Sequence, residues 1–326
     1  MADEKRKVLA PSNMGGAGWD ILHSREDILL IPYPPTIAAE ELHNLLLDAA
    51  GIVVSFTPFG RAEVDAAPLL QVVARIGVGY DAVDVAALTA RRIPLMTTGL
   101  ANSTSVAEKA LYFMLALAKR ATLMDRLVRE GRWHDRYRAM PMEVAGKTVL
   151  VVGFGRIGTR TARRCAALEM RVLVYDPYVA PEAIRSVGYE PAMDLDAALP
   201  VAEFVTIHCP KNSETIGMFG AARLAGMKHG AALINTARGG IVDEAALHEA
   251  LASGHLGGAG LDVFEAEPPS LENALLRRDD VLTAPHMAGV TAEAVAAMAQ
   301  AAARNVLSVL DGAPLAENVV NRAIID

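Results

Sequence analysis

The sequence predicts an α/β protein built from two doubly wound domains, each with a parallel sheet. The chain has 326 residues, which is more than one hydrophobic core usually organises. Short runs rich in Val, Ile and Leu alternate with helical stretches, as in βαβ units. This alternation occurs over residues 7–100 and again from Lys147, with a long helical stretch, 103–130, between the two series.

The first series contains five predicted strands that are short, apolar and closed by Gly or Pro. They are KVLAPS (7–12), ILLIPY (28–33), GIVVSF (51–56), VVARIGVG (72–79) and IPLMTT (93–98). Residues 36–51 predict a helix for which Gly51 is the stop. A single long helix is predicted next, opened by the possible caps Ser103 and Thr104 and closed by EGRW (130–133).

The second series predicts six strands with helices between them. The strands are TVLVVG (148–153), RVLVYD (171–176), FVTIHC (204–209), AALINTA (231–237), GAGLDVF (258–264) and VLTAPH (281–286). Helices are predicted after the first strand, near DLDAALP (194–200), around AARLAGM (221–227) and at DEAALHEALASG (243–254). A strongly periodic helix follows over 291–312 and ends at Gly312.

Composition and charge exclude several classes of partner. The formal net charge of -7 would not attract nucleic acid or an anionic membrane surface. Local groups of arginine, such as Arg163 with Arg164, are interpreted as solvated surface. The two cysteines suggest neither a disulfide framework nor a zinc site, which favours a reducing compartment. No export signal is apparent, and the most apolar run, 110–118, is far shorter than the roughly 20 residues of a membrane span. We therefore expect a cytoplasmic protein with no metal and no membrane or nucleic-acid partner.

A glycine-rich loop follows the first strand of the second series. Gly153, Gly155 and Gly158 form G-x-G-x-x-G between a strand and a helix, and the next strand ends in Asp176. Such glycines allow a tight turn, close approach of a pyrophosphate, and helix–strand packing. An acid at the position of Asp176 can bind ribose hydroxyls and would repel a 2′-phosphate. The pattern predicts NAD in preference to NADP; a turn without a ligand, or a site for another nucleotide, is the alternative.

Seven motifs together resemble one known family. They are RIGVGYDAVD (75–84), NSTSVAE (102–108), GKTVLVVGFGRIG (146–158), HCP (208–210), INTARGGIVDEAAL (234–247), GAGLDVFEAEP (258–268) and PHMAG (285–289). In this order they resemble the D-isomer-specific 2-hydroxyacid dehydrogenases, which include phosphoglycerate dehydrogenase and glyoxylate/hydroxypyruvate reductase. The resemblance implies hydride transfer between NAD(H) and a small 2-hydroxy or 2-keto acid.

The resemblance also implies the domain arrangement. A Rossmann-type NAD-binding domain, residues 101–289, would be inserted into a flavodoxin-like substrate domain made from residues 1–100 and 290–326. The substrate would bind in the cleft between them. The family's C-terminal regulatory domain, which some phosphoglycerate dehydrogenases carry, has no counterpart in the 326 residues.

Three catalytic residues are carried over from the family by their motifs. His286, in the PH motif, would exchange a proton with the substrate oxygen. Glu267 would orient the imidazole and favour its charged form, although Glu265 is a nearby rival for this role. Arg238 would bind the substrate carboxylate and carbonyl through its planar guanidinium. Formate dehydrogenases of this superfamily have Gln at the position of Glu267, so this chain departs from them.

Binding residues are carried over in the same way. Backbone amides of Val78 and Gly79, together with Arg238, would hold the substrate carboxylate. The residues expected to contact NAD are Gly153, Gly155, Arg156, Ile157, Gly158, Asp176, Cys209, Pro210, Thr215, Thr236, Ala237, Asp262, His286 and Gly289. The other histidines considered, His208, His229, His248 and His255, are expected to be structural or exposed.

The sequence does not determine which 2-hydroxy acid is the substrate or how the chains assemble. Where phosphoglycerate enzymes place an arginine, VVSFTPFG (53–60) has none, so Phe56, Pro58 and Phe59 suggest an apolar wall, with Arg61 close in sequence. Family members commonly dimerise through the apolar helix around 110–119, so a homodimer is expected; burial against the chain's own second domain is the alternative. The rival functions are a phosphite-type dehydrogenase and an NAD-sensing protein like the C-terminal-binding transcriptional corepressors.

Overall fold

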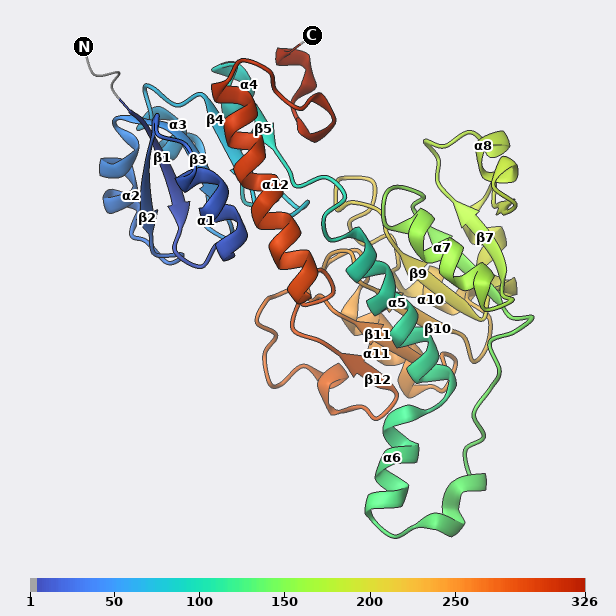
Figure 1. Cartoon of the computed structure of the whole chain (residues 1–326). Helices are drawn as coiled ribbons and strands as arrows, with labels where there is room; N and C mark the ends of the chain where they lie inside the picture. The colour runs from blue at the N-terminus through green and yellow to red at the C-terminus, as the bar shows by residue number, and fades with distance from the viewer. Residues whose placement is uncertain (1–4, 326) are drawn as a thin grey trace. The chain divides into compact units, whose positions relative to one another are not determined.

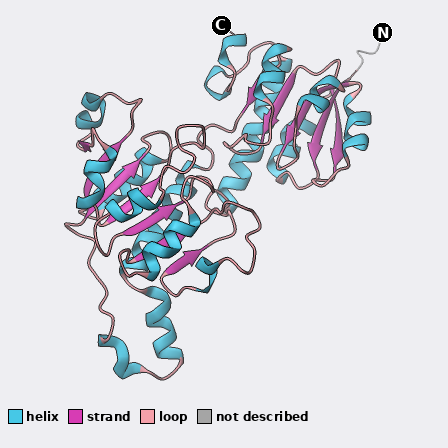
Figure 2. Cartoon of the chain, turned by 180° about the vertical axis from the view of Figure 1, so that it is seen from behind, coloured by secondary structure: helices cyan, strands magenta, loops and turns pink. Residues whose placement is uncertain are grey.

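The computed structural model describes residues 5–325, so the first four residues of the stretch inspected for an export signal lie outside it. The chain divides into two units, Met1–Asn102 with Val290–Asp326, and Ser103–Gly289. Each unit has one sheet with helices on its faces (Figures 1 and 2). Among the described residues, no helix has both the length and the apolar character needed to cross a membrane.

The first unit has a five-stranded parallel sheet in the order β2-β1-β3-β4-β5, the flavodoxin-like order. Its strands are β1 (Arg6–Pro11), β2 (Ile28–Tyr33), β3 (Ala49–Val54), β4 (Val72–Arg75) and β5 (Leu95–Met96). Helices α2 (Ala39–Leu46), α3 (Arg61–Asp65) and α4 (Val85–Ala90) cover one face, whereas α1 (Gly16–His23) and α12 (Ala292–Leu310) cover the other. The unit therefore needs both ends of the chain to complete its core.

Small residues let α12 approach its neighbours. Ala299, Ala302 and Ala303 are buried, and a Cβ atom at Gly18 of α1 would lie 2.7 Å from the carbonyl oxygen of Ala299. The Thr291 side chain caps the helix by accepting the amide of Ala294. The backbone leaves the helix at Gly312, which has a φ of 76°, so the predicted end is confirmed.

Two predicted helix boundaries were wrong. Gly51 does not stop α2, which ends at Leu46; it lies inside β3, where a Cβ would come within 3.1 Å of Val72 and 3.2 Å of Val306. The absence of a side chain at Gly51 lets Val72 and Val306 pack against β3. The single helix predicted over 103–130 is two, α5 (Ser103–Ala118) and α6 (Ala121–Arg129), because Arg120 has a left-handed φ of 48°.

The second unit has a seven-stranded parallel sheet in the order β12-β11-β10-β9-β6-β7-β8. Its strands are β6 (Thr148–Val152), β7 (Arg171–Tyr175), β8 (Glu190–Pro191), β9 (Phe204–Ile207), β10 (Ala232–Asn235), β11 (Gly258–Leu261) and β12 (Val281–Thr283). The helices between them are α7 (Gly158–Ala167), α8 (Pro181–Ser186), α9 (Leu195–Ala198), α10 (Ala221–Gly226) and α11 (Glu244–Ala252). This is the Rossmann order with one added strand, and it reverses direction between β6 and β9. Helix α8 and the two-residue strand β8 were not predicted from the sequence.

Helix α5 packs on the sheet of the second unit, where Phe113 lies so close to β11 that a Cβ at Gly260 would come within 2.6 Å of it. Beyond α5, helix α6 and the 3₁₀ helix η1 (Trp133–Tyr137) extend away from the sheet (Figure 1). We call residues 121–142 the arm. Arg126 of the arm pairs with Asp279 at 2.9 Å, which anchors α6 to the rest of the unit.

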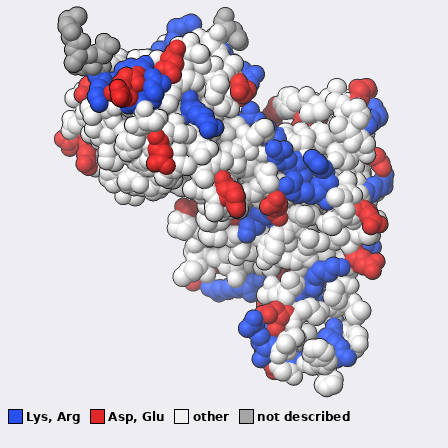
Figure 3. Space-filling view, viewed as in Figure 1, with Lys and Arg blue, Asp and Glu red and all other residues white. Residues whose placement is uncertain are grey.

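Positive and negative side chains are mixed on the visible surface, with a group of basic ones near α7 (Figure 3). Two of the α7 arginines have partners in α5: Arg164 pairs with Glu108 at 3.1 Å, and Nε of Arg160 donates to the Ser103 hydroxyl at 2.9 Å. In the arm, Arg132 and Arg138 both pair with Asp135. These arginines therefore serve local ion pairs and hydrogen bonds.

Candidate active site

Three adjacent strands of the second unit, β10, β11 and β12, carry the residues expected to be catalytic. The strands are parallel, so their carboxyl ends lie at one edge of the sheet, where ligands bind in open α/β folds. Arg238 follows β10, Glu267 lies in the loop after β11, and His286 follows β12. Sheet order thus gathers residues that are far apart in the sequence.

His286 and Glu267 form a hydrogen-bonded pair. Nδ1 of His286 lies 2.7 Å from Oε2 of Glu267, and the two side chains are 40% and 36% exposed. Oε1 of the same carboxylate accepts the amide of Phe264 at 3.1 Å. Nε2 of His286 has no hydrogen-bond partner among the described residues. The arrangement fixes the ring and leaves one ring nitrogen able to exchange a proton with a ligand.

The rival acid, Glu265, has a different set of contacts. Its Oε1 accepts the amide of Glu244 at 3.1 Å, and its own amide donates to Oε1 of Glu244 at 2.5 Å. This reciprocal pair ties the loop after β11 to the first turn of α11. Glu267, and not Glu265, is therefore the acid that contacts the imidazole.

Asp262 positions the backbone that carries His286, a role that was not predicted from the sequence. Its side chain is buried, and its two oxygens accept the amides of Met287 at 2.9 Å and Ala288 at 2.7 Å. Its carbonyl accepts the amide of His286, whose φ is 54°. Burial raises the pKa of Asp262, and the two amide donors oppose that rise. On the other side of the loop, Ser105 of α5 donates to the carbonyl of Ala288 at 2.7 Å.

The turn that carries Arg238 is held by its own hydrogen bonds. Asn235 accepts the amide of Ala237 at 3.0 Å and donates to the carbonyl of Arg238 at 2.9 Å. The guanidinium, which is half-buried, donates to the carbonyl of Ala237 at 2.7 Å. A Cβ at Gly239 would overlap the carbonyl of Phe264, so the turn packs directly on the loop that leads to Glu267.

The glycine loop has the geometry of a dinucleotide site. Gly153 has a φ of 95°, and a Cβ there would lie 2.7 Å from the Cys209 amide nitrogen. A Cβ at Gly158 would overlap the carbonyl of Gly153, whereas nothing lies within 4 Å of one at Gly155. The amides of Gly155 and Ile157 donate to no acceptor among the described residues. An open, amide-lined loop before the ten-residue helix α7 fits a pyrophosphate.

Asp176 lies beside that loop. Its carboxylate accepts the amides of Phe154 at 2.7 Å and Tyr178 at 2.9 Å, so it links the end of β7 to the glycine loop after β6. Cys209 lies close by: burial raises the pKa of its thiol to about 11, and the charge of Asp176 acts in the same direction. An un-ionised thiol is a poor nucleophile, which agrees with the expectation that Cys209 serves packing.

Two threonine hydroxyls near the carboxyl edge of the sheet have contrasting contacts. Thr215 donates to the carbonyl of Pro210 at 2.6 Å and accepts the amide of Asn212 at 2.8 Å, which fixes the loop after β9. Thr236, at the end of β10, is buried, and its hydroxyl has no hydrogen-bond partner within the described part of the chain. A buried polar atom without a partner indicates a ligand or water. The residues present therefore fit a bound dinucleotide.

The other histidines have mainly structural surroundings. His208 faces Thr206 at 2.9 Å, its Nδ1 is buried without a partner among the described residues, and burial lowers its pKa to about 3. His229 is exposed and its ring meets that of His255 edge-on, with centroids 5.9 Å apart. His248 is half-buried. In the described residues there is no group of three or more His, Cys, Asp or Glu that could hold a metal.

In the first unit, Val78 and Gly79 follow β4 at the carboxyl edge of its sheet. Both are partly exposed, and neither amide donates to an acceptor among the described residues. The preceding Gly77 has a φ of 118°, and its amide donates to the Thr98 hydroxyl at 3.2 Å. The turn is thus held in place with two amides available to a carboxylate.

The expected apolar wall was wrong for Phe59, which is fully buried in the core of the first unit. Phe56 is 75% exposed, and the Arg75 guanidinium lies 5.5 Å from its ring centroid. Arg75 is the last residue of β4 and pairs in register with Val54 of β3. Arg61, the cation noted in the sequence, pairs with Asp65 at 2.9 Å. The cation over the Phe56 ring is therefore Arg75, which was not predicted from the sequence.

Comparison with known proteins agrees with this geometry. A sequence profile described as "D-isomer specific 2-hydroxyacid dehydrogenase, NAD binding domain" matches residues 111–288. The chain belongs to this family. The chain is 40% identical to a D-3-phosphoglycerate dehydrogenase of Archaeoglobus fulgidus over 93% of its own length and 57% of the relative's. It is 39% identical to a glyoxylate reductase of Korarchaeum cryptofilum over 85% and 84% of the two lengths.

A solved structure has the same fold. A D-lactate dehydrogenase from Aquifex aeolicus, crystallised with NAD and lactic acid, matches with a TM-score of 0.85 and 27% identity, covering 96% of this chain and 99% of the other. The α/β fold with two parallel sheets predicted from the sequence is confirmed, as is the family that its motifs resemble.

Proposed function

We propose that this protein is an NAD-dependent oxidoreductase that interconverts a small 2-hydroxy acid and its 2-keto acid. The observation that carries the proposal is the His286–Glu267 pair, 2.7 Å apart, on the same sheet edge as Arg238 and in the same unit as the glycine loop. The named relatives, a D-3-phosphoglycerate dehydrogenase and a glyoxylate reductase, support this reaction class.

In this proposal the glycine loop and α7 hold the pyrophosphate of the cofactor, whose nicotinamide supplies or accepts the hydride when bound. Nε2 of His286 donates a proton to the keto oxygen in reduction and takes it back in oxidation. Glu267 holds the ring through Nδ1 and stabilises its cationic form. Arg238 binds the carboxylate and the carbonyl oxygen, which gains negative charge as the carbonyl is reduced.

The remaining binding roles follow the same assignment. Amides of Val78 and Gly79 take the substrate carboxylate. The loop residues Cys209, Pro210 and Thr215 line the cofactor path, and Thr236, Ala237, Asp262 and Gly289 lie toward the nicotinamide. Asp176 binds the adenosine ribose and selects NAD over NADP, because its charge opposes a 2′-phosphate. We assign the protein to the cytoplasm, since both described cysteines are free thiols.

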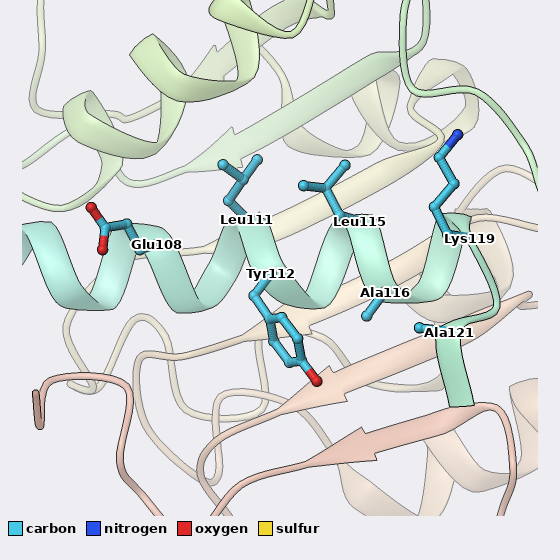
Figure 4. Close-up of a pocket in the computed structure, with 7 residues that line it drawn as sticks. All are labelled: Glu108, Leu111, Tyr112, Leu115, Ala116, Lys119 and Ala121. Atoms are coloured by element: carbon cyan, nitrogen blue, oxygen red, sulfur yellow. The ribbon is translucent and has the colours of Figure 1, made fainter. Parts of the chain in front are cut away.

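We also propose a homodimer formed through α5 and the arm. The outer side of α5 has an apolar groove, lined chiefly by Leu111, Tyr112, Leu115 and Ala116 (Figure 4). In the arm, four large apolar side chains are more than half exposed: Val128, Trp133, Tyr137 and Met140. Exposed apolar surface of this extent is typical of protein contacts. Sedimentation should give a dimer for the wild type and a monomer for Tyr112→Glu.

A panel of 2-keto acids tests the proposed reaction. The purified chain, mixed with NADH and glyoxylate, hydroxypyruvate, pyruvate or related acids, should oxidise NADH with at least one of them. NADH binding without turnover across a broad panel would contradict the enzyme proposal and favour an NAD-sensing role. Oxidation coupled to phosphite with NAD, in place of keto-acid turnover, would favour a phosphite-type dehydrogenase.

A further inference from the structure

A hydrogen bond joins two loops of the second unit that lie on either side of the glycine loop. The hydroxyl of Tyr178 donates to Oε2 of Glu214. Tyr178 follows β7, and Glu214 lies in the loop after β9. Both residues are exposed, Tyr178 to 77%. Because both residues are exposed, this contact does not contribute to the packing of a hydrophobic core.

The strand order shows what the bond crosses. In the sheet, β6 lies between β7 and β9, so the two loops start two strand spacings apart, or about 9.5 Å. The glycine loop leaves β6 in that interval. It is also where the strand order reverses, between β6 and β9, and where a dinucleotide binds in such folds. The Tyr178–Glu214 bond therefore spans the carboxyl end of β6, where the glycine loop begins.

The Tyr178 side of the bridge is held in place by the cofactor-binding machinery. The amide of Tyr178 donates to Oδ1 of Asp176 at 2.9 Å, while Oδ2 accepts the amide of Phe154 in the glycine loop at 2.7 Å. Because one carboxylate holds both segments, the start of the tyrosine side chain is fixed relative to the proposed ribose site.

The Glu214 side is also held in place. Oδ1 of Asn212 accepts the amides of Glu214 at 2.9 Å and Thr215 at 3.2 Å. The Thr215 hydroxyl donates to the carbonyl of Pro210 at 2.6 Å. Neither loop depends on the bridge for its own conformation. The bond can therefore open and close without disturbing the loops.

We propose that Tyr178 and Glu214 form a latch over the adenosine half of the cofactor site, and that the latch slows release of the bound dinucleotide. The inference rests on the proposed function, since it takes the carboxyl edge of the sheet at β6 as the NAD site. Asp176 assigns the adenosine ribose to the end of β7, and the bridge starts two residues further on. The nicotinamide half, toward β10 to β12, lies outside the bridge.

Release kinetics of NADH test the latch. NADH is displaced from the full chain by excess NAD in a stopped-flow instrument, and NADH fluorescence reports the rate. Tyr178→Phe keeps the ring and removes the donor, and should raise the dissociation rate constant about fivefold, the effect of losing one hydrogen bond. Glu214→Ala should raise it to the same extent. The double variant should match either single variant, because both remove the same bond.

Ligand fragments locate the latch. ADP carries the adenosine and both phosphates, so its dissociation rate constant, measured by surface plasmon resonance, should rise about fivefold in Tyr178→Phe, in line with the loss of one hydrogen bond. Reduced nicotinamide mononucleotide lacks adenosine and should leave both proteins at the same rate. Tyr137→Phe, an exposed tyrosine of the arm, is the matched control and should release NADH at the wild-type rate.

The possible outcomes distinguish failure of the latch from failure of the proposed function. If the wild type binds NADH but Tyr178→Phe releases it at the wild-type rate, the latch is refuted and the proposed function stands. Additive effects in the double variant, or an equal effect on the mononucleotide, would also refute it. If the wild type binds no NADH while its circular dichroism is that of a folded α/β protein, the cofactor site and the latch are both overturned.

Discussion

Nδ1 of His286 lies 2.7 Å from Oε2 of Glu267, and Oε1 of the same carboxylate accepts the Phe264 amide. The carboxylate is thus fixed by the backbone of its own loop, and the imidazole is fixed by the carboxylate. The ring nitrogen that remains, Nε2, is presented in a defined direction. This geometry indicates that His286 transfers the proton and that Glu267 orients the imidazole ring of His286.

Replacing the two residues should therefore have effects of the same kind but different size. His286→Ala should lower kcat by about 10³-fold or more, since it removes the acid itself. Glu267→Gln should lower kcat by on the order of 10², because the amide still contacts the ring but no longer stabilises its cation. NADH fluorescence titration should show nearly unchanged binding in both. Equal losses of NADH affinity and of kcat in His286→Ala would contradict its assignment as the acid.

Asp262→Asn tests the role of Asp262 in holding the His286 loop. An asparagine offers one oxygen to two amide donors, those of Met287 and Ala288, and places an N–H group against the other. We expect a loss of about 1–3 kcal/mol in unfolding free energy, the cost of an unsatisfied buried donor, together with a lower kcat. Thermal unfolding and steady-state kinetics measure the two. If Asp262→Asn kept the wild-type unfolding free energy but had a lower kcat, Asp262 would act only by contacting a ligand.

Asp176→Ala tests cofactor selection. Removing the carboxylate should raise the ratio of kcat/KM for NADPH to that for NADH by about tenfold or more, since a repulsion between like charges is lost. Affinity for NADH should fall as well, because Asp176 also holds the amides of Phe154 and Tyr178. Asp194→Ala, which removes the cap of α9, is a control in the same unit. An unchanged ratio would contradict the assigned ribose contact.

Local signals predicted one part of the site from the sequence. The G-x-G-x-x-G motif stands between a strand and a helix of one βαβ unit, so it can be recognised locally, and the contact that requires Gly158, with the carbonyl of Gly153, also lies inside that unit. The same locality explains α12, whose apolar period and terminal Gly312 lie within one segment. Gly51 misled because a glycine after an apolar helix resembles a helix stop, whereas here it admits Val72 and Val306 from elsewhere in the unit.

The catalytic pair could not be derived in this way. His286 and Glu267 are 19 residues apart, and their contact depends on β11 and β12 being neighbours, which only the assembled sheet determines. They were found through motifs, and the role of Asp262 in positioning His286 was missed because a buried acid after a strand has no pattern of its own. Tertiary contacts also decided the burial of Phe59.

His208 predicts how the stability of the second unit changes with pH. Burial lowers its folded-state pKa to about 3, whereas an unfolded histidine has a pKa of about 6.5. Between these values the unfolded state binds the proton and the folded state does not. Stability that is fully present above pH 6.5 is therefore lost as the pH falls, by up to about 1.4 kcal/mol per pH unit.

His208→Gln should remove this part of the acid sensitivity. The amide can still meet the Thr206 hydroxyl, which lies 2.9 Å from Nε2 of His208, but it does not titrate. Thermal midpoints without cofactor, measured from pH 7.5 to 5.5, should fall more steeply for the wild type than for His208→Gln. The exposed His134 of the arm supplies the control, and His134→Gln should follow the wild type. Parallel curves for wild type and His208→Gln would show that the folded state takes up the proton at His208, and would contradict its assignment as a neutral imidazole.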